Sequence, residues 1–350
     1  MPEFGLAGAE IMCESLVYEF LKHEECEVVV VSLYDYQSAI TQRLEKRGVN
    51  VIYLDKKQGT DFTIIRKLIK VIKQYRISVV HTHRYVMEYA IPAAMLAGVK
   101  TRIHTVHNIA KGEMGRLHRF LAKCFYKFCN VVPVAISPLI KRSVQEEYRL
   151  SDARIQMVYN GIDLSRCSKK TIYSFKSTFR FIHVGRLVPV KNQELIIKAV
   201  KVLVDDRYNV VVNFLGEGDR EEYYKSLVKE YSLEDNISFL GLKDEVCSFL
   251  ADSDAFLLPS VYEGMPITLI EAMGTGLPII ASNVGGIPDM ITHEREGLLV
   301  EPTIETLVSA MKRLIEDEAL RSFLGTNAYN RSRLFSSENM YNGYLKLYAN

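Results

Sequence analysis

Short apolar runs alternate with longer stretches of helical periodicity along nearly the whole chain. In the first half, apolar runs typical of buried strands cover residues 28–33, 51–54, 77–81, 102–107 and 131–136. Apolar residues recur at helical spacing between these runs, at about 36–47, 61–75, 85–97, 113–128 and 138–147. This alternation is typical of a parallel sheet covered by helices on both faces. Since crossovers between parallel strands are right-handed, we predict a doubly wound α/β domain.

The second half repeats the alternation. Its predicted strands cover 179–184, 210–215, 237–240, 255–258, 277–281 and 297–300, with a helix at 193–204 and further helices from 303 onward. At 350 residues the chain is long enough for about two domains. A polar segment without pattern suggests a linker between them. The expected division is a domain at 1–165, a linker at 166–178, a domain at 179–334 and a last helix at 335–350.

The most informative stretch is residues 257–282, LLPSVYEGMPITLIEAMGTGLPIIAS. It predicts a strand, a glycine turn, a helix beginning after Pro266, and a second strand. Glu263 precedes the helix and Glu271 lies near its end. Free N–H groups at a helix start attract anions, and carboxylates accept hydrogen bonds from hydroxyl groups. The layout favours a ligand with both phosphate and ribose. The alternative is that Glu263 caps the helix and Glu271 is a solvated surface residue.

Two glycine-containing loops follow strands of the second half. In GRLVPVKN, Arg186 and Lys191 lie five residues apart at the carboxyl end of a strand, so both cations can reach one diphosphate. The alternative is two unrelated surface cations. Gly216-Glu217-Gly218-Asp219 is another glycine turn before a helix. It is not the GxGxxG pattern of a nicotinamide site, which makes a dehydrogenase a poor candidate.

These motifs, in this order, resemble the family 4 glycosyltransferases over nearly the whole chain. The resemblance lies in Glu263-x7-Glu271, in the GRLVPVKN and GEG loops, in GLAGAE at residues 5–10 and in NGID at residues 160–163. It implies the GT-B fold, in which two Rossmann-like domains face a cleft. It also implies retention of anomeric configuration. The second domain would hold a nucleotide-sugar donor and the first an acceptor, and the last helix would cross back to the first domain.

The resemblance also implies roles for single residues. His107 sits where the family carries an active-site histidine, near the reacting carbon. Its alternative is a strand-end histidine bonded to backbone, and His81, His83 and His104 lie at similar strand ends. The implied catalytic residues are His107, Glu263, Arg186 and Lys191. The implied donor-binding residues are Gly8, Gly185, Arg186, Lys191, Gly216, Glu217, Glu263, Gly264, Met265, Pro266 and Glu271, with Glu271 on the ribose and Glu263 on the sugar hydroxyls.

We expect no metal and no other cofactor. Breaking the bond between sugar and diphosphate places negative charge on the leaving phosphate, and Arg186 and Lys191 would neutralise it. The six cysteines show no CxxC pair and no metal-ligand spacing. They indicate free thiols in a reducing compartment. No apolar run approaches the length of a transmembrane helix and no signal-peptide pattern is present, so we expect a cytoplasmic protein.

Charge is unevenly distributed. Residues 1–165 hold 23 Lys and Arg against 17 Asp and Glu, or +6, whereas the remainder holds 21 against 25, or −4. The excess of positive charge indicates an anionic partner for the first half, such as a membrane surface or an acidic acceptor, rather than nucleic acid. The helix at 113–128 has one basic face and one apolar face, a pattern found in helices that lie in anionic membrane surfaces. Its alternative is an ordinary domain helix with a solvated basic face.

The amino end departs from the family pattern. GLAGAE resembles the loop after the first strand of the sheet, yet only MPEF precedes it. We therefore expect that the chain is truncated or that Met1 is not the natural start. In-frame upstream DNA would then encode a short apolar run.

The function expected from the sequence is sugar transfer from a nucleotide-diphosphate donor, favoured to be a UDP-sugar. The acceptor would be a saccharide or a lipid-linked molecule in surface polysaccharide or glycolipid synthesis. Two alternatives stay open. One is a nucleotide-sugar epimerase with the same architecture, and the other is a truncated, inactive binding protein.

Overall fold

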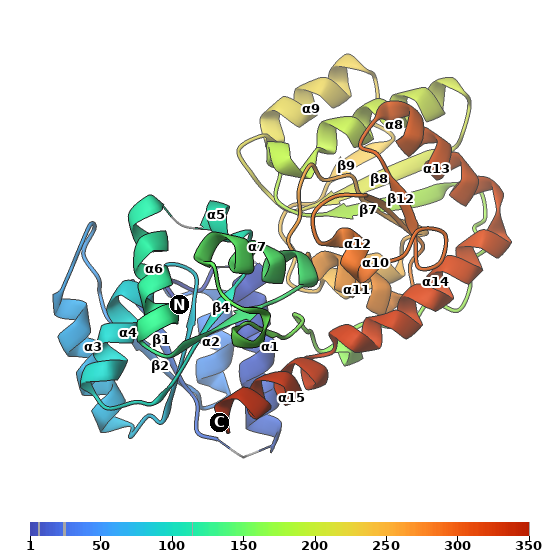
Figure 1. Cartoon of the computed structure of the whole chain (residues 1–350). Coiled ribbons are helices and arrows are strands. Elements are labelled where there is room, and N and C mark those ends of the chain that lie inside the picture. Colours follow the sequence, from blue (N-terminus) through green and yellow to red (C-terminus); the bar gives the residue numbers. More distant parts are fainter. Residues whose placement is uncertain (6–7, 24–25, 114, 350) are drawn as a thin grey trace. The chain divides into compact units, whose positions relative to one another are not determined.

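A computed structural model describes residues 1–5, 8–23, 26–113 and 115–349. The chain divides into two compact units (Figure 1). Unit 1 comprises residues 1–162 and 337–350, and unit 2 comprises residues 163–336. Each unit is described by itself.

Unit 2 contains one continuous parallel sheet of six strands in the order β12-β11-β10-β7-β8-β9. The strands are β7 (Phe179–Val184), β8 (Val210–Leu215), β9 (Ile237–Phe239), β10 (Ala255–Leu258), β11 (Ile279–Ser282) and β12 (Leu298–Val300). The helices are α8 (Gln193–Asp205), α9 (Glu221–Glu230), α10 (Val246–Ala251), α11 (Ile267–Thr275), α12 (Ile287–Met290), α13 (Ile304–Glu316) and α14 (Glu318–Ser332), with short 3₁₀ turns at Leu164–Arg166, Pro189–Lys191 and Arg333–Phe335. All six strands predicted for this half are confirmed to within two residues. The sequence order reverses direction between β7 and β10, which is where ligands bind in open α/β sheets.

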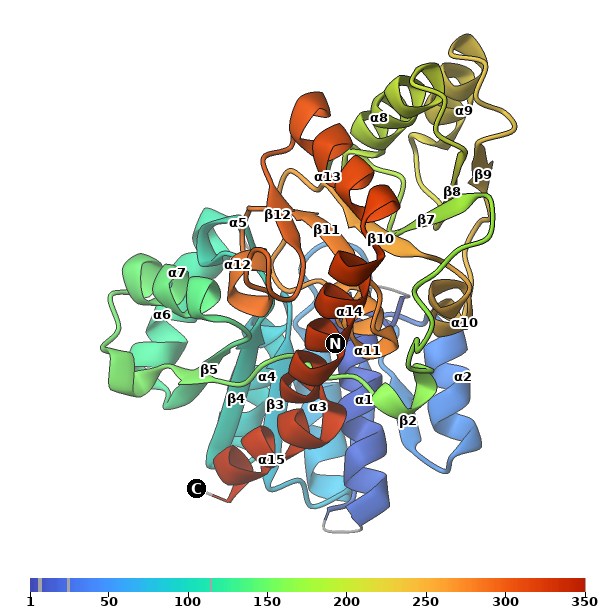
Figure 2. The same cartoon turned by 90° about the vertical axis from the view of Figure 1, so that its right-hand side faces the viewer.

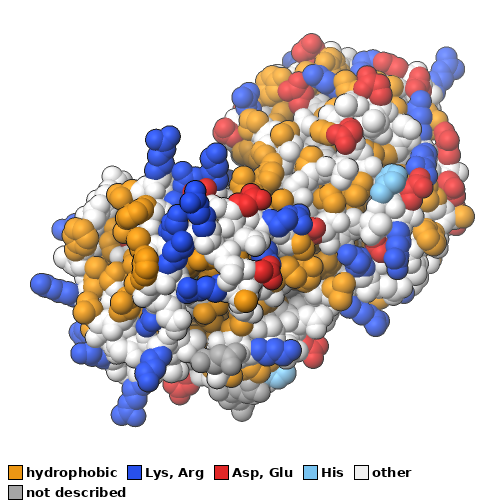
Figure 3. Space-filling view, in the orientation of Figure 1, with side chains coloured by type: hydrophobic (Ala, Val, Ile, Leu, Met, Phe, Trp, Pro, Cys, Tyr) orange, Lys and Arg blue, Asp and Glu red, His pale blue; other side chains and the backbone are white. Residues whose placement is uncertain are grey.

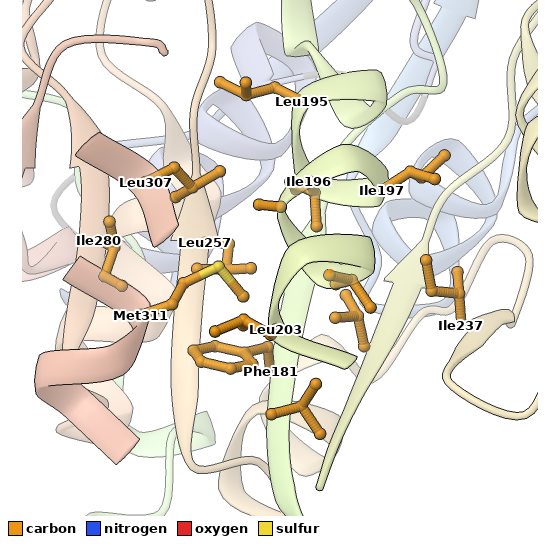
Figure 4. Packing of buried hydrophobic residues seen from close by; sticks show 14 of the residues in the cluster. Phe181, Leu195, Ile196, Ile197, Leu203, Ile237, Leu257, Ile280, Leu307 and Met311 are labelled. Atoms are coloured by element: carbon orange, nitrogen blue, oxygen red, sulfur yellow. The ribbon is translucent and has the colours of Figure 1, made fainter. Parts of the chain in front are cut away.

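The core of unit 2 forms because the strands are apolar on both faces. Helices α8 and α13 pack side by side on one face of the sheet. Figure 4 shows Met311 of α13 and Leu203 of α8 meeting over Phe181 of β7. All three side chains are fully buried. Near-continuous apolar strands of this kind are expected where helices cover both faces of a parallel sheet.

Unit 1 contains two separate parallel sheets, of order β3-β4-β5-β6 and β1-β2. The strands are β1 (Val29–Ser32), β2 (Asn50–Tyr53), β3 (Val79–His83), β4 (Thr101–Val106), β5 (Val131–Ala135) and β6 (Gln156–Met157). The helices are α1 (Gly8–His23), α2 (Ala39–Lys46), α3 (Thr63–Gln74), α4 (Met87–Leu96), α5 (Ala110–Glu113), α6 (Arg116–Phe128), α7 (Pro138–Tyr148) and α15 (Ser337–Tyr348), with a 3₁₀ turn at Asp152–Arg154. The five predicted strands are confirmed, and β6 was not foreseen.

A cavity of about 580 Å³ lies between the two sheets of unit 1. One wall of the cavity is lined by residues 28–31, in and next to β1. Another wall is lined by residues 77–83, in and next to β3. The Met1 amine donates a hydrogen bond to the Val31 carbonyl (3.0 Å), and the Leu33 N–H donates to the Pro2 carbonyl (2.9 Å). Burial lowers the pKa of that amine. The expectation about sequence upstream of Met1 stays a prediction.

Helix α15 packs along α1 within unit 1, as both views show (Figures 1 and 2). The Phe20 ring meets Tyr341 edge-on at 4.8 Å and stacks on Tyr348 at 5.4 Å. The segment expected to be a linker packs on unit 2. The Lys170 N–H donates to the Thr275 carbonyl (2.8 Å), and the buried Tyr173 hydroxyl donates to the Gly276 carbonyl (2.9 Å).

A disulfide joins Cys167 to Cys247, with Cα atoms 5.1 Å apart. The prediction of six free thiols is therefore wrong for this pair, while Cys13, Cys124 and Cys129 are free thiols. The bonded residues are 80 positions apart, and only the packing of unit 2 brings them together. Cysteine usage consequently gives no support to a reducing compartment.

Across the described residues, no helix combines the length and the apolar character that crossing a bilayer requires.

Candidate functional site

Two predicted site residues of unit 2 form an ion pair at the reversal point of the sheet. Lys191 follows β7 and Glu263 follows β10, and these are neighbouring parallel strands. The Lys191 ammonium donates a hydrogen bond to Glu263 Oε1 at 2.6 Å. The Ser260 hydroxyl donates to the same oxygen at 2.7 Å. Because the Glu263 side chain is only 9% exposed, this carboxylate is held in one place.

The backbone fastens the two loops together. The Val261 N–H donates to the Val190 carbonyl (2.8 Å), and the Asn192 side-chain amide donates to the Pro259 carbonyl (3.1 Å). Asn192 has a left-handed backbone (φ 59°) and ends the short turn that carries Lys191. Asparagine is among the residues that adopt this conformation most readily. The ion pair is thus positioned by local backbone structure on both sides.

Glycines allow the neighbouring loops to approach this pair closely. A Cβ at Gly216 would lie 2.2 Å from the Gly185 carbonyl oxygen, and its φ is +131°. A Cβ at Gly285 would lie 2.0 Å from the Glu263 carbonyl oxygen. Only glycine fits at either position. The loops after β7, β8, β10 and β11 therefore form one continuous backbone surface.

Sequence reasoning missed two buried side chains beneath this surface. His183 Nδ1 lies 2.9 Å from the Leu257 carbonyl oxygen, so this nitrogen carries the proton and donates. His183 Nε2 then accepts from the Gln193 side-chain amide (3.1 Å), which also donates to the Arg186 carbonyl (2.8 Å). Burial lowers the pKa of His183 to about 4. The pair fixes the path of the Arg186 loop, and no sequence pattern marks it.

The remaining donor-site candidates of the first loops lie beside the ion pair. The Arg186 side chain is exposed. The Leu187 N–H donates to the Glu217 carbonyl (3.0 Å), which joins the loops after β7 and β8. Glu217 Oε1 accepts from the Leu242 N–H at 3.4 Å. Gly264, Met265 and Pro266 form the approach to α11, with Pro266 at the N-cap position.

Glu271 lies in a different set of charges. Burial raises the pKa of this α11 carboxyl to about 7, partly offset by the Arg166 guanidinium and reinforced by the Glu245 carboxylate. Arg166 and Glu245 are themselves ion-paired at 3.3 Å. Glu271 is therefore a partly buried residue and not the solvated surface residue of the alternative interpretation.

Unit 1 brings His81, His83 and His107 together at the carboxyl ends of β3 and β4, and His104 lies in β4 beside Thr82. His83 Nδ1 lies 3.0 Å from His107 Nε2, and the His81 and His83 rings lie 4.1 Å apart. His104 Nδ1 contacts the Thr82 hydroxyl at 2.9 Å. Burial lowers the pKa of all four, to about 3 for His104 and His107. His107 therefore contacts a second imidazole.

Gly8 is the first residue of α1, and positions 6 and 7 of its loop lie outside the described residues. Close to it, Glu10 is completely buried and pairs with Arg84, which follows β3. Glu10 Oε2 is buried without a hydrogen-bond partner among the described atoms. Arg84 also contributes to the lowered pKa of His107. The Glu10–Arg84 pair was not foreseen from the sequence.

Among the described residues, no group of three or more His, Cys, Asp or Glu side chains could hold a metal ion. The chain does contain an Asp-x-Asp triplet at residues 252–254. Asp254 accepts from the Arg180 N–H (2.9 Å) and pairs with Lys170 (3.6 Å). This carboxylate therefore anchors β7 and the segment before it.

Two Rossmann-like units with parallel sheets are the architecture of the GT-B fold of glycosyltransferases. The match to solved structures supports this fold. The Anabaena protein HepE, solved in complex with UDP and glucose, superposes with a TM-score of 0.82 at 18% identity, over 99% of this chain and 97% of that one. The predicted GT-B fold is thus confirmed.

Comparison with family models identifies the family. The model for "Glycosyltransferase Family 4" matches residues 6–166, and the model for "Glycosyl transferases group 1" matches residues 168–331. The chain belongs to the family 4 glycosyltransferases, as its motifs predicted. An Escherichia coli relative, UDP-Gal:alpha-D-GlcNAc-diphosphoundecaprenol alpha-1,3-galactosyltransferase, is 29% identical over 77% of this chain and 74% of its own length. The Staphylococcus aureus capsular polysaccharide biosynthesis glycosyltransferase CapH is 26% identical over 89% of this chain and 88% of its own.

Proposed function

We propose that this glycosyltransferase moves a sugar from a UDP-sugar to a saccharide or lipid-linked acceptor, with retention of configuration and without a metal ion. The product would enter surface polysaccharide or glycolipid synthesis. The observation that carries the proposal is the Lys191–Glu263 pair at the reversal point of the unit 2 sheet. The UDP in the HepE complex and the diphosphoundecaprenol acceptor named for the Escherichia coli relative support the choice of donor and acceptor.

The ion pair suits a diphosphate sugar because its two charges serve different parts of the donor. The Lys191 ammonium has three N–H donors and gives one to Glu263, so others are available for phosphate oxygens. Arg186, exposed on the same loop, supplies a second cation. When the bond between the sugar and the diphosphate breaks, its electron pair moves to the phosphate oxygen. Cations fixed in advance stabilise that charge without reorganisation.

The other assigned roles follow the same chemistry. Glu263 accepts hydrogen bonds from sugar hydroxyls, and Glu271 accepts them from the ribose. His107 is neutral at neutral pH because burial lowers its pKa to about 3. A neutral imidazole can hydrogen-bond to the sugar near the reacting carbon without repelling the positive charge that develops there.

Calorimetric titration with UDP, GDP and ADP in EDTA tests the donor site. We expect UDP to bind and Lys191→Ala to lower transfer from a UDP-sugar by about 10²–10³, the usual effect of removing one preorganised charge donor. Lys198→Ala is a matched control, because Lys198 forms an ion pair with Glu194 at the same 2.6 Å on the surface of α8. This control should retain full activity.

Three outcomes would contradict the proposal. If Lys191→Ala transferred sugar as fast as the unaltered protein, the Lys191–Glu263 pair would not belong to the donor site. UDP release that does not depend on acceptor would favour an epimerase-like enzyme. Failure of all three nucleotides to bind would favour an inactive binding protein.

A membrane surface is the proposed location of the acceptor, on the cytoplasmic side. Helix α6 exposes three large apolar side chains, Leu117 (68%), Phe120 (62%) and Phe128 (81%), so its apolar face does not pack as an ordinary core face. Figure 3 shows hydrophobic and Lys or Arg side chains gathered side by side over this part of unit 1. Apolar groups beside basic ones suit anionic lipid. Arg119 is an exception, since it pairs with Glu147.

Co-sedimentation with vesicles of phosphatidylglycerol or phosphatidylcholine tests this location. We expect binding to the anionic vesicles alone and its loss in Leu117→Ser/Phe120→Ser. The control is Phe323→Ser, which removes an equally exposed aromatic side chain from α14 of unit 2. Failure of the unaltered protein to bind phosphatidylglycerol would exclude the membrane contact.

A further inference from the structure

The carboxyl-terminal helix reaches the histidines of unit 1 through two tyrosine hydroxyls. The Tyr348 hydroxyl lies 2.6 Å from His81 Nδ1. The Tyr344 hydroxyl lies 2.7 Å from the Thr105 hydroxyl, which in turn lies 2.8 Å from His81 Nε2. Both nitrogens of the His81 ring are therefore bonded, one directly to α15 and one through β4. This fixes the orientation of the ring.

The His83 ring packs against this fixed His81 ring. The His81 and His83 rings have centroids 4.1 Å apart and are tilted by 37°. His83 is 5% exposed, so its side chain has little freedom to rotate. Its Nδ1 meets Nε2 of His107 at 3.0 Å. A continuous series of contacts thus runs from α15 through β3 to His107.

Position along the sheet explains why His83 and not another histidine meets His107. His83 pairs with Thr105 in the register of β3 and β4. His107 lies two residues beyond Thr105, just past the end of β4 and partly exposed. The buried His83 therefore contacts one nitrogen of His107, a residue that is itself partly exposed.

We propose that His83 is a positioning residue that sets the tautomer and orientation of His107, and that Tyr344 and Tyr348 of α15 hold His83 in place through His81. Two neutral imidazoles joined by one hydrogen bond must share a single proton between the bonded nitrogens. The tautomers of the two rings are therefore coupled: His107 carries its proton on Nδ1 when His83 Nδ1 donates, and on Nε2 when His107 itself donates. This inference rests on the proposed role of His107 in sugar transfer.

Two substitutions at His83 separate the hydrogen bond from the ring. His83→Phe keeps a flat ring against His81 but removes Nδ1, whereas His83→Asn keeps a hydrogen-bonding group near that atom and removes the ring. We expect His83→Phe to lower kcat by about tenfold to a hundredfold, because small misplacements of a catalytic group have effects of this size. The KM for donor should change little, and His83→Asn should recover most of kcat.

Two variants on α15 test the outer part of the contact series. Tyr348→Phe should lower kcat by about threefold, the effect of losing one hydrogen bond. The control is Tyr341→Phe on the same helix, whose ring packs on Phe20 and His23 of α1 instead of on His81. It reports any general effect of altering α15, and it should leave kcat unchanged.

Nitrogen-15 NMR of the imidazoles provides a readout that does not depend on activity. In the unaltered protein His107 should show one fixed tautomer, and in His83→Phe an average of two. A fixed tautomer in both proteins would overturn the inference, even if transfer activity fell. If the tautomer changes as expected but transfer is unaffected, the positioning stands and the proposed role of His107 fails.

Discussion

In unit 2 one parallel sheet runs unbroken through six strands, whereas unit 1 divides its strands between a sheet of four and a sheet of two. The loops of unit 2 approach so closely that Gly216 and Gly285 admit no Cβ. Unit 1 has a partly open cavity of about 580 Å³ between its sheets. Unit 2 therefore positions its candidate loops through backbone contacts, whereas in unit 1 His107 contacts the His83 side chain.

This difference indicates where each unit is vulnerable. In unit 2 the candidate groups lie on loops at the carboxyl ends of strands, and a change in the backbone of one loop affects its neighbours. In unit 1 the histidines sit on or just beyond β3 and β4, and β3 is an edge strand that borders the cavity. The backbone N–H and C=O groups on the unpaired edge of β3 have no neighbouring strand among the described residues to bond to, and the apolar side chains beside it are not fully buried. Both features lower the stability of unit 1.

The first prediction concerns the cavity of unit 1, which an added strand would fill. Five apolar, β-branched residues fused ahead of Met1 would extend the pairing that Met1 and Pro2 already make with residues 31–33. They would also move the buried amine out of the cavity. Burying each added side chain stabilises the fold by about 2 kcal/mol, and ordering each added residue costs conformational entropy. The balance over five residues predicts that the free energy of unfolding rises by about 2–4 kcal/mol. Chemical denaturation with hydrogen exchange on β1 and β3 measures it.

The control is a Gly-Ser extension of equal length, which should not stabilise unit 1. Protection of β10 in unit 2 should be unchanged by either extension. Equal stability of the two extended proteins would show that the cavity does not accept a strand.

Much of this comparison could be predicted from sequence, because hydrophobic periodicity specifies elements well. All the strands expected in both halves are present, and among the described residues the two-residue β6 is the one strand that was missed. Lys191 and Glu263 were both predicted as site residues from their motifs, but their direct ion pair was not foreseen. The pair forms because β7 and β10 are neighbours in the sheet. Hydrophobic periodicity along the chain does not show which strands become neighbours.

The missed features share one physical cause, which is contact between distant segments. The Cys167–Cys247 disulfide spans 80 residues. The charges around Glu271 come from segments at 166 and 245. For α6, the sequence showed a basic and an apolar face, but only packing reveals that Phe120 and Phe128 stay exposed.

The second prediction concerns backbone contact in unit 2. Gly216→Ala should destabilise unit 2 by about 1–3 kcal/mol, the usual cost of a strained backbone position, and should lower UDP affinity at least tenfold. The reason is that its Cβ would lie 2.2 Å from the Gly185 carbonyl, next to the Arg186 loop. Denaturation and calorimetric titration measure the two effects.

Gly48→Ala in unit 1 is the matched control. Gly48 also has a positive φ (+82°), but no atom lies within 4 Å of its added Cβ. It should show backbone strain alone and unchanged UDP affinity. If both variants bound UDP normally, close loop contact would not matter for the donor site.

The third prediction concerns a difference in how the two units respond to pH. Burial lowers the pKa of His81, His83, His104 and His107, so below about pH 6.5 the unfolded chain takes up protons that folded unit 1 does not. Stability of unit 1 therefore falls as pH decreases from 6.5, by up to about 1.4 kcal/mol per pH unit for each histidine.

In unit 2 two groups act in opposite directions. Burial lowers the pKa of His183 to about 4, which destabilises the unit as pH falls below 6.5. Burial raises the pKa of Glu271 to about 7, so the folded unit binds a proton that the unfolded chain releases above about 4.5, and stability falls as pH rises from 4.5 to 7. Between pH 4.5 and 6.5 the two slopes cancel.

Hydrogen exchange at β4 and at β10, measured in one sample, reports the stability of unit 1 and of unit 2 under the same conditions. Corrected for intrinsic exchange rates, protection of β4 should fall steeply between pH 6.5 and 4.5, while protection of β10 stays nearly level. Glu271→Gln removes one of the two opposing groups, so β10 should then follow the sign of β4 with the slope of one histidine. A level β10 profile in this variant would show that the Glu271 carboxyl is not held in its neutral form, and that its burial is not what separates the two units.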